Sequence, residues 1–229
     1  MWHGMLITVF VVVGDLLYSL MLNQISMQLD LLAVQLENIV QVHCDQQLKE
    51  EFPLGLHQGE ANEVSGTPAE IATDRDETEA KLISIIKRHV VLIKLGEDVE
   101  GILSISLLIN FVNSSMILCF CGYCCVLVEK WNELAYKSFL VTAMCQTFLL
   151  CWYGQKLLDA SVRVSCAAYN CGWYVMSAKI RKYLLYIMMR AQKPVSVTAY
   201  GYCVIGFKCY TTIVKTAWSY FTLLLNVLK

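Results

Sequence analysis

The chain has 229 residues, of which 57% are hydrophobic and 16% charged, and its formal net charge at pH 7 is −1. Soluble domains carry about 25% charged residues, so this composition, with a mean hydropathy of +0.52, favours a membrane protein. The small net charge argues against the basic surface that binds nucleic acid, and we expect no nucleic-acid partner.

Four apolar stretches are long enough to cross a bilayer, which takes about 20 helical residues. They are residues 5–25, 102–128, 139–158 and 203–228. The first contains Asp15, but it has neither a basic segment before it nor a small-residue cleavage site after it, so it is interpreted as a span and not as a signal peptide. We therefore expect an all-α, polytopic transmembrane helical bundle in the lipid bilayer.

Two amphipathic helices are predicted between the first two spans. Residues 28–50 and 76–98 keep apolar side chains at helical spacing, and the acidic, Gly- and Pro-containing stretch 51–78 between them reads as a flexible loop. A further amphipathic helix over 176–192 is expected to start at an N-cap, Ser177, and to stop before Pro194. Its shared apolar face would consist of Ile180, Leu184, Ile187, Met188 and Ala191.

The cysteines and histidines do not indicate enzyme chemistry. Cys121 and Cys124 have CxxC spacing, but they lie in an apolar stretch where packing explains them better than a metal or a redox pair. The same holds for the cysteines of the neighbouring apolar runs, Cys119, Cys125, Cys145 and Cys151, and for Cys166 and Cys171. The four histidines show no metal-binding spacing, and His89 is expected at a surface or an anchor contact. We expect no metal, no cofactor and no catalytic residue.

The distribution of basic residues predicts the orientation. Lys and Arg dominate the segment 156–193 between the last two spans, where Asp159 is the one acid, so this side is predicted to be cytoplasmic. The short 129–138 loop is then external, and the 28–98 segment is cytoplasmic. Both chain ends fall outside the cell, which is unusual for a complete protein and suggests the C-terminal half of something longer.

The last span is polar along one side. On a helical projection of about 100° per residue, six polar residues fall within about 40° of one line. They are Lys208, Thr212, Lys215, Ser219, Thr222 and Asn226. Such a stripe is typical of a helix that lines a water-filled pore, or of one buried against partner helices through small polar residues while its lysines reach for the surface. The pattern alone leaves both readings open.

The C-terminal region resembles the signature of insect odorant receptors. The resemblance rests on CGWY at 171–174, IRKYLLYIMMRAQKPVSVTA at 180–199 and IVKTAWSYFTLLLNVLK at 213–229, above all on RAQKP at 190–194 and on Ser-Tyr-Phe at 219–221. It extends more loosely to residue 1. Members of this family have seven spans, so the resemblance implies that the chain holds the fourth to seventh and is a truncated product.

The resemblance implies a domain arrangement. Residues 1–27 would be the fourth span, 28–98 cytoplasmic helices with the 51–78 loop, 99–128 the fifth span, 129–138 an extracellular loop and 139–170 the sixth span with a cytoplasmic extension. Residues 171–194 would form the cytoplasmic anchor helix, 195–202 a joint and 203–229 the pore-lining helix. The anchor and joint would include Arg190, Gln192, Lys193 and Pro194.

The resemblance also implies a function. An odorant, a small volatile organic ligand, would open a non-selective cation channel formed as a hetero-oligomer, expected to be a tetramer, with a shared co-receptor in the plasma membrane of olfactory sensory neurons. By alignment on Ser-Tyr-Phe, the gate would fall on Leu223 and Val227, with the polar Asn226 beside it. The odorant pocket would draw on Tyr136, Phe139, Met144, Phe10 and Val13, each of which could equally serve ordinary packing.

Several features depart from this pattern or leave alternatives. Tyr200 stands where a glycine is usual after Thr-Ala, Trp218 replaces a commoner tyrosine, and two lysines on the stripe would repel cations in a homotetramer. A G-protein-coupled receptor is disfavoured because its Asp-Arg-Tyr and Asn-Pro-x-x-Tyr signatures are absent. A gustatory-type receptor and a non-conducting four-span scaffold remain alternatives.

Overall fold

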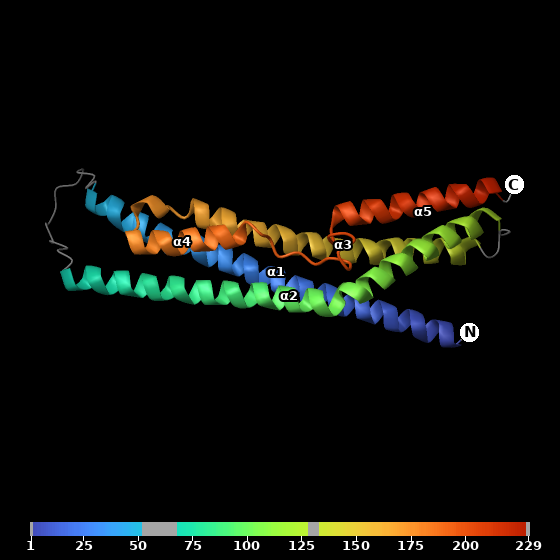
Figure 1. Ribbon diagram of the computed structural model, residues 1–229, viewed down its shortest axis with the longest axis horizontal. Coiled ribbons are helices and arrows are strands. Elements are labelled where there is room, and N and C mark those ends of the chain that lie inside the picture. The colour runs from blue at the N-terminus through green and yellow to red at the C-terminus, as the bar shows by residue number, and fades with distance from the viewer. Residues whose placement is uncertain (1, 52–67, 128–132, 228–229) are drawn as a thin grey trace, which may run out of the picture. The chain divides into compact units, whose positions relative to one another are not determined.

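The computed structural model describes the backbone of residues 2–51, 68–127 and 133–227, and these are almost entirely helical (Figure 1). The elements are α1 (Trp2–Glu51), α2 (Pro68–Leu127), α3 (Glu133–Asn170), a 3-10 turn (Trp173–Val175), α4 (Ala178–Ala191) and α5 (Phe207–Val227). Within the described residues there is no strand, only an isolated bridge between Thr198 and Val204. The predicted all-α fold class is confirmed.

The helices divide between two compact units. The first consists of Met1–Ser26, Lys94–Asp159 and Val195–Lys229, and the second of Met27–Ile93 and Ala160–Pro194. Helices α1, α2 and α3 each contribute residues to both units without a break. The amphipathic helices expected at 28–50 and 76–98 are thus continuations of the first two predicted spans, since no proline interrupts either run to force a stop.

Two predicted loops are shorter than expected. Helix α2 begins at Pro68, so the flexible loop predicted over 51–78 is wrong for its last part. Proline suits the first helical turn because its missing N–H would have no partner there. Helix α3 begins at Glu133, so the second half of the predicted 129–138 loop is helical too. The remainders, 52–67 and 128–132, lie outside the described residues.

The second unit has a tightly buried core. On α1, Leu29, Leu32 and Leu36 are spaced three and four residues apart and are fully buried. Helix α4 buries four of the five residues predicted for its apolar face, with Met188 half-buried. Its N-cap is Ser177, as predicted, and the Ser177 side chain accepts a hydrogen bond from the Ile180 backbone N–H at 3.5 Å.

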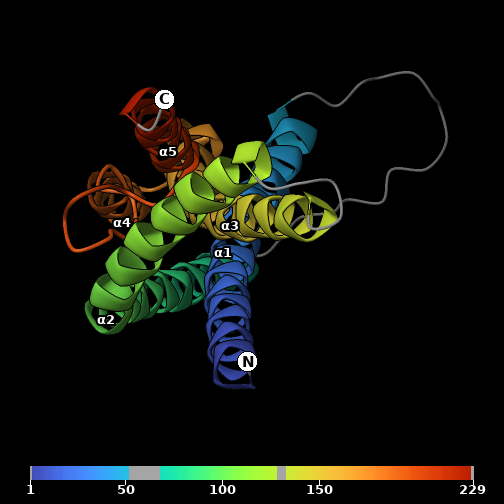
Figure 2. The ribbon, with the colours of Figure 1, turned by 90° about the vertical axis from the view of Figure 1, so that its right-hand side faces the viewer.

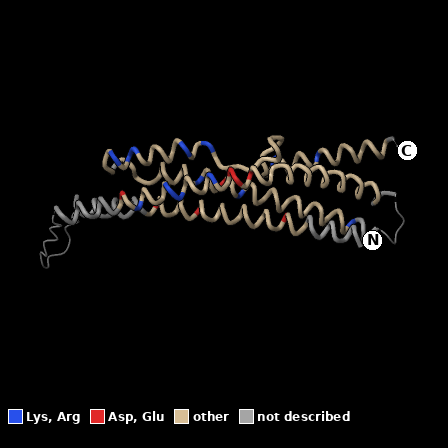
Figure 3. Tube along the Cα trace, turned by 60° about the horizontal axis from the view of Figure 1, so that its bottom comes forward, with Lys and Arg blue, Asp and Glu red and all other residues tan. Residues whose placement is uncertain are grey.

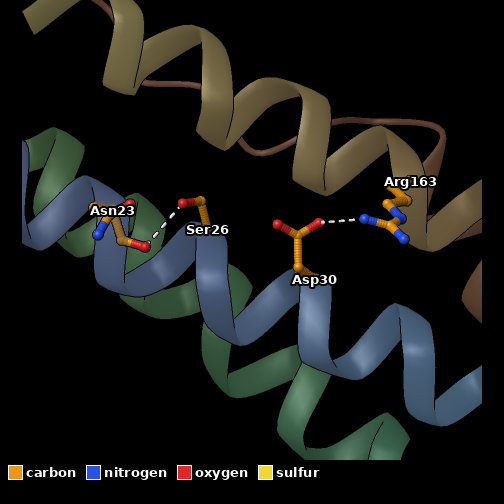
Figure 4. A network of polar contacts seen from close by, with 4 residues as sticks. All are labelled: Asn23, Ser26, Asp30 and Arg163. Atoms are coloured by element: carbon orange, nitrogen blue, oxygen red, sulfur yellow. Dashed lines mark hydrogen bonds and ion pairs between the residues drawn. The ribbon is translucent and has the colours of Figure 1, made fainter. Parts of the chain in front are cut away.

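Ion pairs join the helices of this unit. The Arg163 guanidinium on α3 lies 3.4 Å from the Asp30 carboxylate on α1 (Figure 4). The Lys179 ammonium on α4 lies 2.6 Å from the Glu79 carboxylate on α2. The Arg163 and Lys179 side chains are more than half exposed, so each ion pair stabilises the fold by about 1 kcal/mol or less. Their main effect is to fix how the paired helices align along their lengths.

The first unit shows an apolar outer face. Along α2, apolar side chains spaced three or four residues apart point outward, and several are more than half exposed: Ile102, Ile105, Ile109, Val112, Met116 and Phe120. In Figure 3 this part of the tube is mostly tan, the colour of residues other than Lys, Arg, Asp and Glu. A contiguous exposed apolar face of this kind suits lipid or neighbouring helices and not water.

One segment is long and apolar enough to cross a membrane among the residues whose side chains are described, Thr78–Cys124, and most of its apolar window is exposed. Charged residues recur from Glu79 to Glu100 and are absent from there to Cys124. The uncharged part of this segment therefore lies beyond Glu100, where the second span was predicted. The other three spans remain predictions from sequence.

Candidate functional site

Helix α5 has one buried and one exposed side. Cys209, Ile213 and Ala217 recur every four residues and are buried in the first unit. In Figure 1, α5 runs beside the last turns of α2 and the first half of α3. A Cβ added to Gly122 of α2 would lie 3.3 Å from the Phe221 ring, which confirms that α2 and α5 approach closely.

An aromatic cluster holds the first turn of α5 against α3. Phe148 and Trp152 on α3 meet Phe207 and Tyr210 on α5, with ring centroids 5.5 to 6.3 Å apart. Tilted, edge-on and offset arrangements at these distances stabilise by about 0.5–1.5 kcal/mol each beyond the burial of area. The cluster therefore fixes which side of α5 faces the bundle.

The opposite side of α5 carries the predicted polar stripe. Lys208, Thr212, Lys215, Ser219 and Asn226 are exposed and Thr222 is half-buried. The hydroxyls of Thr212 and Thr222 donate to the backbone carbonyls of Lys208 and Ser219, both at 2.9 Å. Aromatic residues flank the stripe on its two sides, Trp218 at 66% exposed and Tyr220 at 58%.

The residues predicted for the gate lie at the end of the same helix. Leu223 is 58% exposed and lies at the margin of the stripe, and Asn226 is exposed within it. Val227 is the last residue of α5, and its side chain lies outside the described set. An exposed leucine thus lies beside the last part of the stripe, between Thr222 and Asn226 and about one helical turn before the end of α5.

A tight hairpin separates α4 from α5. The Ala199 N–H donates to the Cys203 carbonyl and the Ile205 N–H to the Val197 carbonyl, both at 2.9 Å. At its tip, Tyr200 (φ +50°) and Gly201 (φ +72°) both adopt left-handed backbone, as a type I′ turn requires. Tyr200, which stands where the family pattern has glycine, therefore occupies a conformation that glycine adopts more easily.

The last helix begins later in the sequence than predicted, because the hairpin precedes it. Residues 203–206 were predicted as helix, but α5 begins at Phe207, because the hairpin hydrogen bonds and the turn that follows them keep these residues out of the helix. A disulfide between Cys203 and Cys209 ties the hairpin to the first turn of α5. Thr198 also donates to the Glu100 carboxylate, which fastens the hairpin to α2.

The predicted anchor and joint residues occupy the end of α4. Arg190 lies in its last turn, Gln192 caps it, and Lys193 and Pro194 follow in non-helical backbone. Gln192 and Lys193 are exposed, whereas Arg190 and Pro194 are half-buried. His89 of α2 is almost fully buried in the same unit. Burial, with a smaller contribution from the Arg190 charge, lowers the pKa of His89 below its usual 6.5.

Three of the five predicted odorant-pocket residues have described side chains. Val13 and Phe139 are 48% and 58% exposed, and Met144 is half-buried. The side chains of Phe10 and Tyr136 lie outside the described set. The exposed side chains of Val13 and Phe139 can contact a ligand or other helices, and they are not buried among the described residues.

A polar cluster inside the first unit was missed by the sequence analysis. Asp15 on α1 is 6% exposed, and its two carboxylate oxygens accept hydrogen bonds from Asn110 Nδ2 on α2, at 2.6 Å, and Gln146 Nε2 on α3. An acid in an apolar span was a usable signal. Its partners, 95 and 131 residues away, could not be identified without the tertiary structure.

Comparisons with known proteins agree with this architecture. The family model described as 7tm Odorant receptor matches residues 1–218. Among curated relatives of Drosophila melanogaster, odorant receptor 67c is 37% identical over 145 residues, covering 62% of this chain and 35% of that receptor. Odorant receptor 85b is 32% identical over 157 residues, covering 68% of this chain and 40% of that receptor. The matches thus span less than half the length of these relatives.

The solved structures extend the likeness to the fold. The insect olfactory receptor OR5 from Machilis hrabei, in complex with eugenol, superposes with a TM-score of 0.61 over 98% of this chain and 69% of that receptor, at 16% sequence identity. The same receptor without that ligand gives 0.58. Because the family model covers nearly the whole sequence, the chain belongs to the odorant receptor family.

Proposed function

We propose that the chain acts in an odorant receptor subunit in which a small volatile organic ligand opens a non-selective cation channel. Its partner would be a shared co-receptor, and the two would form a hetero-oligomer, expected to be a tetramer. This assembly would lie in the plasma membrane of olfactory sensory neurons. Family membership supports the receptor part of this proposal. The observation that carries the channel part is the exposed polar stripe of α5 opposite its buried Cys209–Ile213–Ala217 edge.

The stripe favours a water-filled path over lipid. Lysine and hydroxyl side chains in hydrocarbon are costly, so ionisable residues in membrane helices face a bundle interior or a water path. Small polar residues alone could pack against another helix. Lys208 and Lys215, two turns apart on the exposed side, are poor contacts for such a helix but are readily solvated in a conduit.

The proposed gate is an apolar constriction at the end of α5. Leu223 and Val227 would narrow the conduit and exclude water in the closed state, since hydrophobic constrictions can gate by dewetting. Leu223 is about 60° from the centre of the stripe, so a modest rotation of α5 would exchange leucine for Asn226 in the wall. Ligand binding would bias that rotation.

The proposed ligand class is small, volatile and mainly apolar. The related receptor OR5 was solved with eugenol, a ligand of that receptor. In this chain we propose Phe139, Met144, Tyr136, Phe10 and Val13 as contributors to the pocket wall. Aromatic and methionine side chains hold such ligands by dispersion and shape, with few polar contacts.

The proposal is tested by recording currents. The full chain is expressed with the co-receptor, and in parallel it replaces the matched segment of odorant receptor 67c in a chimera, with surface labelling of both. We expect odorant-evoked cation current from at least the chimera. Surface-expressed protein that gives no current with a broad odorant panel, while unmodified 67c responds, would instead favour a non-conducting scaffold.

The gate is tested separately with Leu223→Ala. Removing most of an exposed apolar side chain from the constriction should widen it and raise the basal leak without odorant, by about tenfold if dewetting loses about 1.4 kcal/mol. Ile213→Val, on the buried side of α5, is the matched control and should leave the leak unchanged. An unaltered leak and unaltered blocker sensitivity in Leu223→Ala would place the gate elsewhere.

A further inference from the structure

The charge on the exposed side of α5 has one sign. Lys208 and Lys215 are the ionisable side chains with formal charge on this helix, and no aspartate or glutamate occurs between Phe207 and Val227. The lysines are seven residues apart, so they lie on the same side of the helix, about 10 Å apart along its axis. Both are exposed.

Neither lysine forms an ion pair with an acid among the described residues. Three acids of the first unit accept hydrogen bonds from other side chains: Asp15 from Asn110 and Gln146, Glu100 from Thr198, and Asp159 from Gln155. The ion pairs of Arg163 with Asp30 and of Lys179 with Glu79 both lie in the second unit. The stripe therefore presents two ammonium groups among hydroxyls and an amide.

The valence of a passing ion determines how strongly such a charge acts. A fixed positive charge lowers the local concentration of a cation by a Boltzmann factor, and for a divalent ion the energy doubles, so the factor is squared. At about 6 Å in physiological salt, one lysine lowers a monovalent concentration about twofold to threefold and a divalent one about fourfold to tenfold. The lysine thus changes the ratio between the two ions, even where both still permeate.

We propose that Lys215, with Lys208 nearer the start of α5, makes this subunit select against divalent cations such as Ca²⁺ in the conducting assembly. This inference rests on the proposed function, because it requires α5 to face the conduit. Lys215 is the stronger determinant, since it lies deeper in the helix than Lys208, whose first-turn position is tied to the hairpin by the nearby disulfide of Cys209.

The test is the Ca²⁺/Na⁺ permeability ratio, taken from reversal potentials of the odorant-evoked current in the receptor–co-receptor complex. Lys215→Gln should raise the ratio about twofold to threefold, and Lys215→Glu should raise it further, because the sign of the local potential changes. Lys215→Arg keeps the charge and should leave the ratio unchanged. Lys182→Gln, at an exposed lysine of α4, is the matched control and should leave it unchanged as well.

A second measurement restores the charge within one assembled channel. Lys215→Cys is recorded before and after reaction with a cationic or an anionic thiol reagent, using the unsubstituted chain to account for its own cysteines. The cationic adduct should lower the Ca²⁺/Na⁺ ratio and the anionic adduct should raise it. Equal ratios for all three states would overturn the inference.

A third variant distinguishes failure of this inference from failure of the proposed function. Ser219→Cys lies on the same stripe without carrying charge, and its reaction with a thiol reagent should block the odorant-evoked current. If Ser219→Cys is blocked while the Lys215 variants leave the ratio unchanged, α5 faces the conduit and the lysine inference alone is wrong. If Ser219→Cys is inaccessible in both closed and open states, the conduit lies elsewhere and both fail.

Discussion

At the scale of single residues, Asp15 shows what a buried acidic side chain requires of its neighbours. It lies within an apolar segment of α1, is almost fully buried, and is held by amide groups from α2 and α3. Its neighbour Ser19 donates to the Asp15 backbone carbonyl at 2.8 Å. A buried acid without such donors would be strongly destabilising, so the two amides are required partners and link three helices at one point.

Substitution of Asn110 by leucine should show this requirement. Asn110→Leu leaves one Asp15 oxygen buried without its donor, which costs about 1–3 kcal/mol of unfolding free energy. Asn113→Leu, at an exposed position one turn away on the same helix, should change stability by less than about 0.5 kcal/mol. The measurement is thermal unfolding of the purified chain in detergent, and equal losses for the two variants would contradict the assigned role.

His89 should make the second unit sensitive to acid. Its pKa is lowered in the folded state, chiefly by burial, so the unfolded chain binds the proton more readily. The contribution of His89 to the unfolding free energy is therefore fully present at pH values above its usual pKa of 6.5. It is lost as the pH falls below this value, by at most about 1.4 kcal/mol per pH unit. His89→Leu should lose less stability than the wild type between pH 7.5 and 5.5, when both are compared by their melting temperatures.

If the two proteins lose equal stability over that interval, His89 is not the responsible group. Arg190, whose charge adds to the lowering, offers a companion variant. Arg190→Gln should raise the pKa of His89 slightly towards its usual value and weaken the acid sensitivity, in the same direction as His89→Leu but by less.

At the scale of elements, the position of α5 depends on a close approach between α3 and the hairpin. A Cβ added to Gly154 would lie 2.7 Å from the Ile205 carbonyl oxygen and 2.6 Å from its Cγ2 atom. The neighbouring Gly206 has the Gln155 side chain at 2.7 Å from its own added Cβ. A side chain at Gly154 would meet this backbone and push the start of α5 away from α3, and with it the aromatic cluster of Phe148 and Phe207, whereas at Gly206 the flexible Gln155 side chain can move aside.

Gly154→Ala should therefore destabilise the first unit. Since backbone and not a flexible side-chain end is in the way, we expect a loss of about 1–3 kcal/mol. Gly101→Ala, with nothing within 4 Å of its added Cβ, is the control and should stabilise the helix by about 0.5–1 kcal/mol. Unfolding in detergent measures both, and a stabilising effect at Gly154 would show that the hairpin is not held at this distance.

At the scale of the whole molecule, charge distinguishes the parts of the sequence. Along α2 charged residues stop at Glu100, whereas α4 with its flanks carries the basic residues expected on the cytoplasmic side (Figure 3). Figure 2 looks along the helices from the end where the labels N and C lie. Helices α1, α2 and α3 each run through both units without a break. A long uninterrupted helix of this kind can pass from the bilayer into water without exposing unpaired backbone groups.

The predicted orientation places the C-terminus outside the cell. An epitope after Lys229 should be labelled by antibody on intact cells that express the chain with the co-receptor, because the basic segment 156–193 keeps the other side of the bundle cytoplasmic. An epitope inserted at residues 58–59, in the predicted cytoplasmic loop, should be labelled only after permeabilisation. The reverse pattern would overturn the orientation.

Much of the secondary structure could be predicted from local sequence. Helical apolar spacing, the scarcity of proline and the Ser177 cap depend on neighbours within one or two turns, so the all-α fold, the buried face of α4 and the polar stripe of α5 were visible in the sequence. The helix boundaries were less visible. The residues 203–206 were predicted as helix, and the hairpin that replaces this helix depends on left-handed backbone at Tyr200, which a tyrosine in the sequence does not indicate.

The amino-acid sequence by itself thus determined the helices, their apolar and polar faces and the family to which the chain belongs, because these follow from short-range spacing and motifs. Only the tertiary structure decided that Asn110 and Gln146 meet at Asp15, and that Cys203 reaches Cys209. Six residues along a continuous helix are about 9 Å apart, so the two sulfurs meet only because the chain turns between them. Contacts of this kind depend on how separate segments pack.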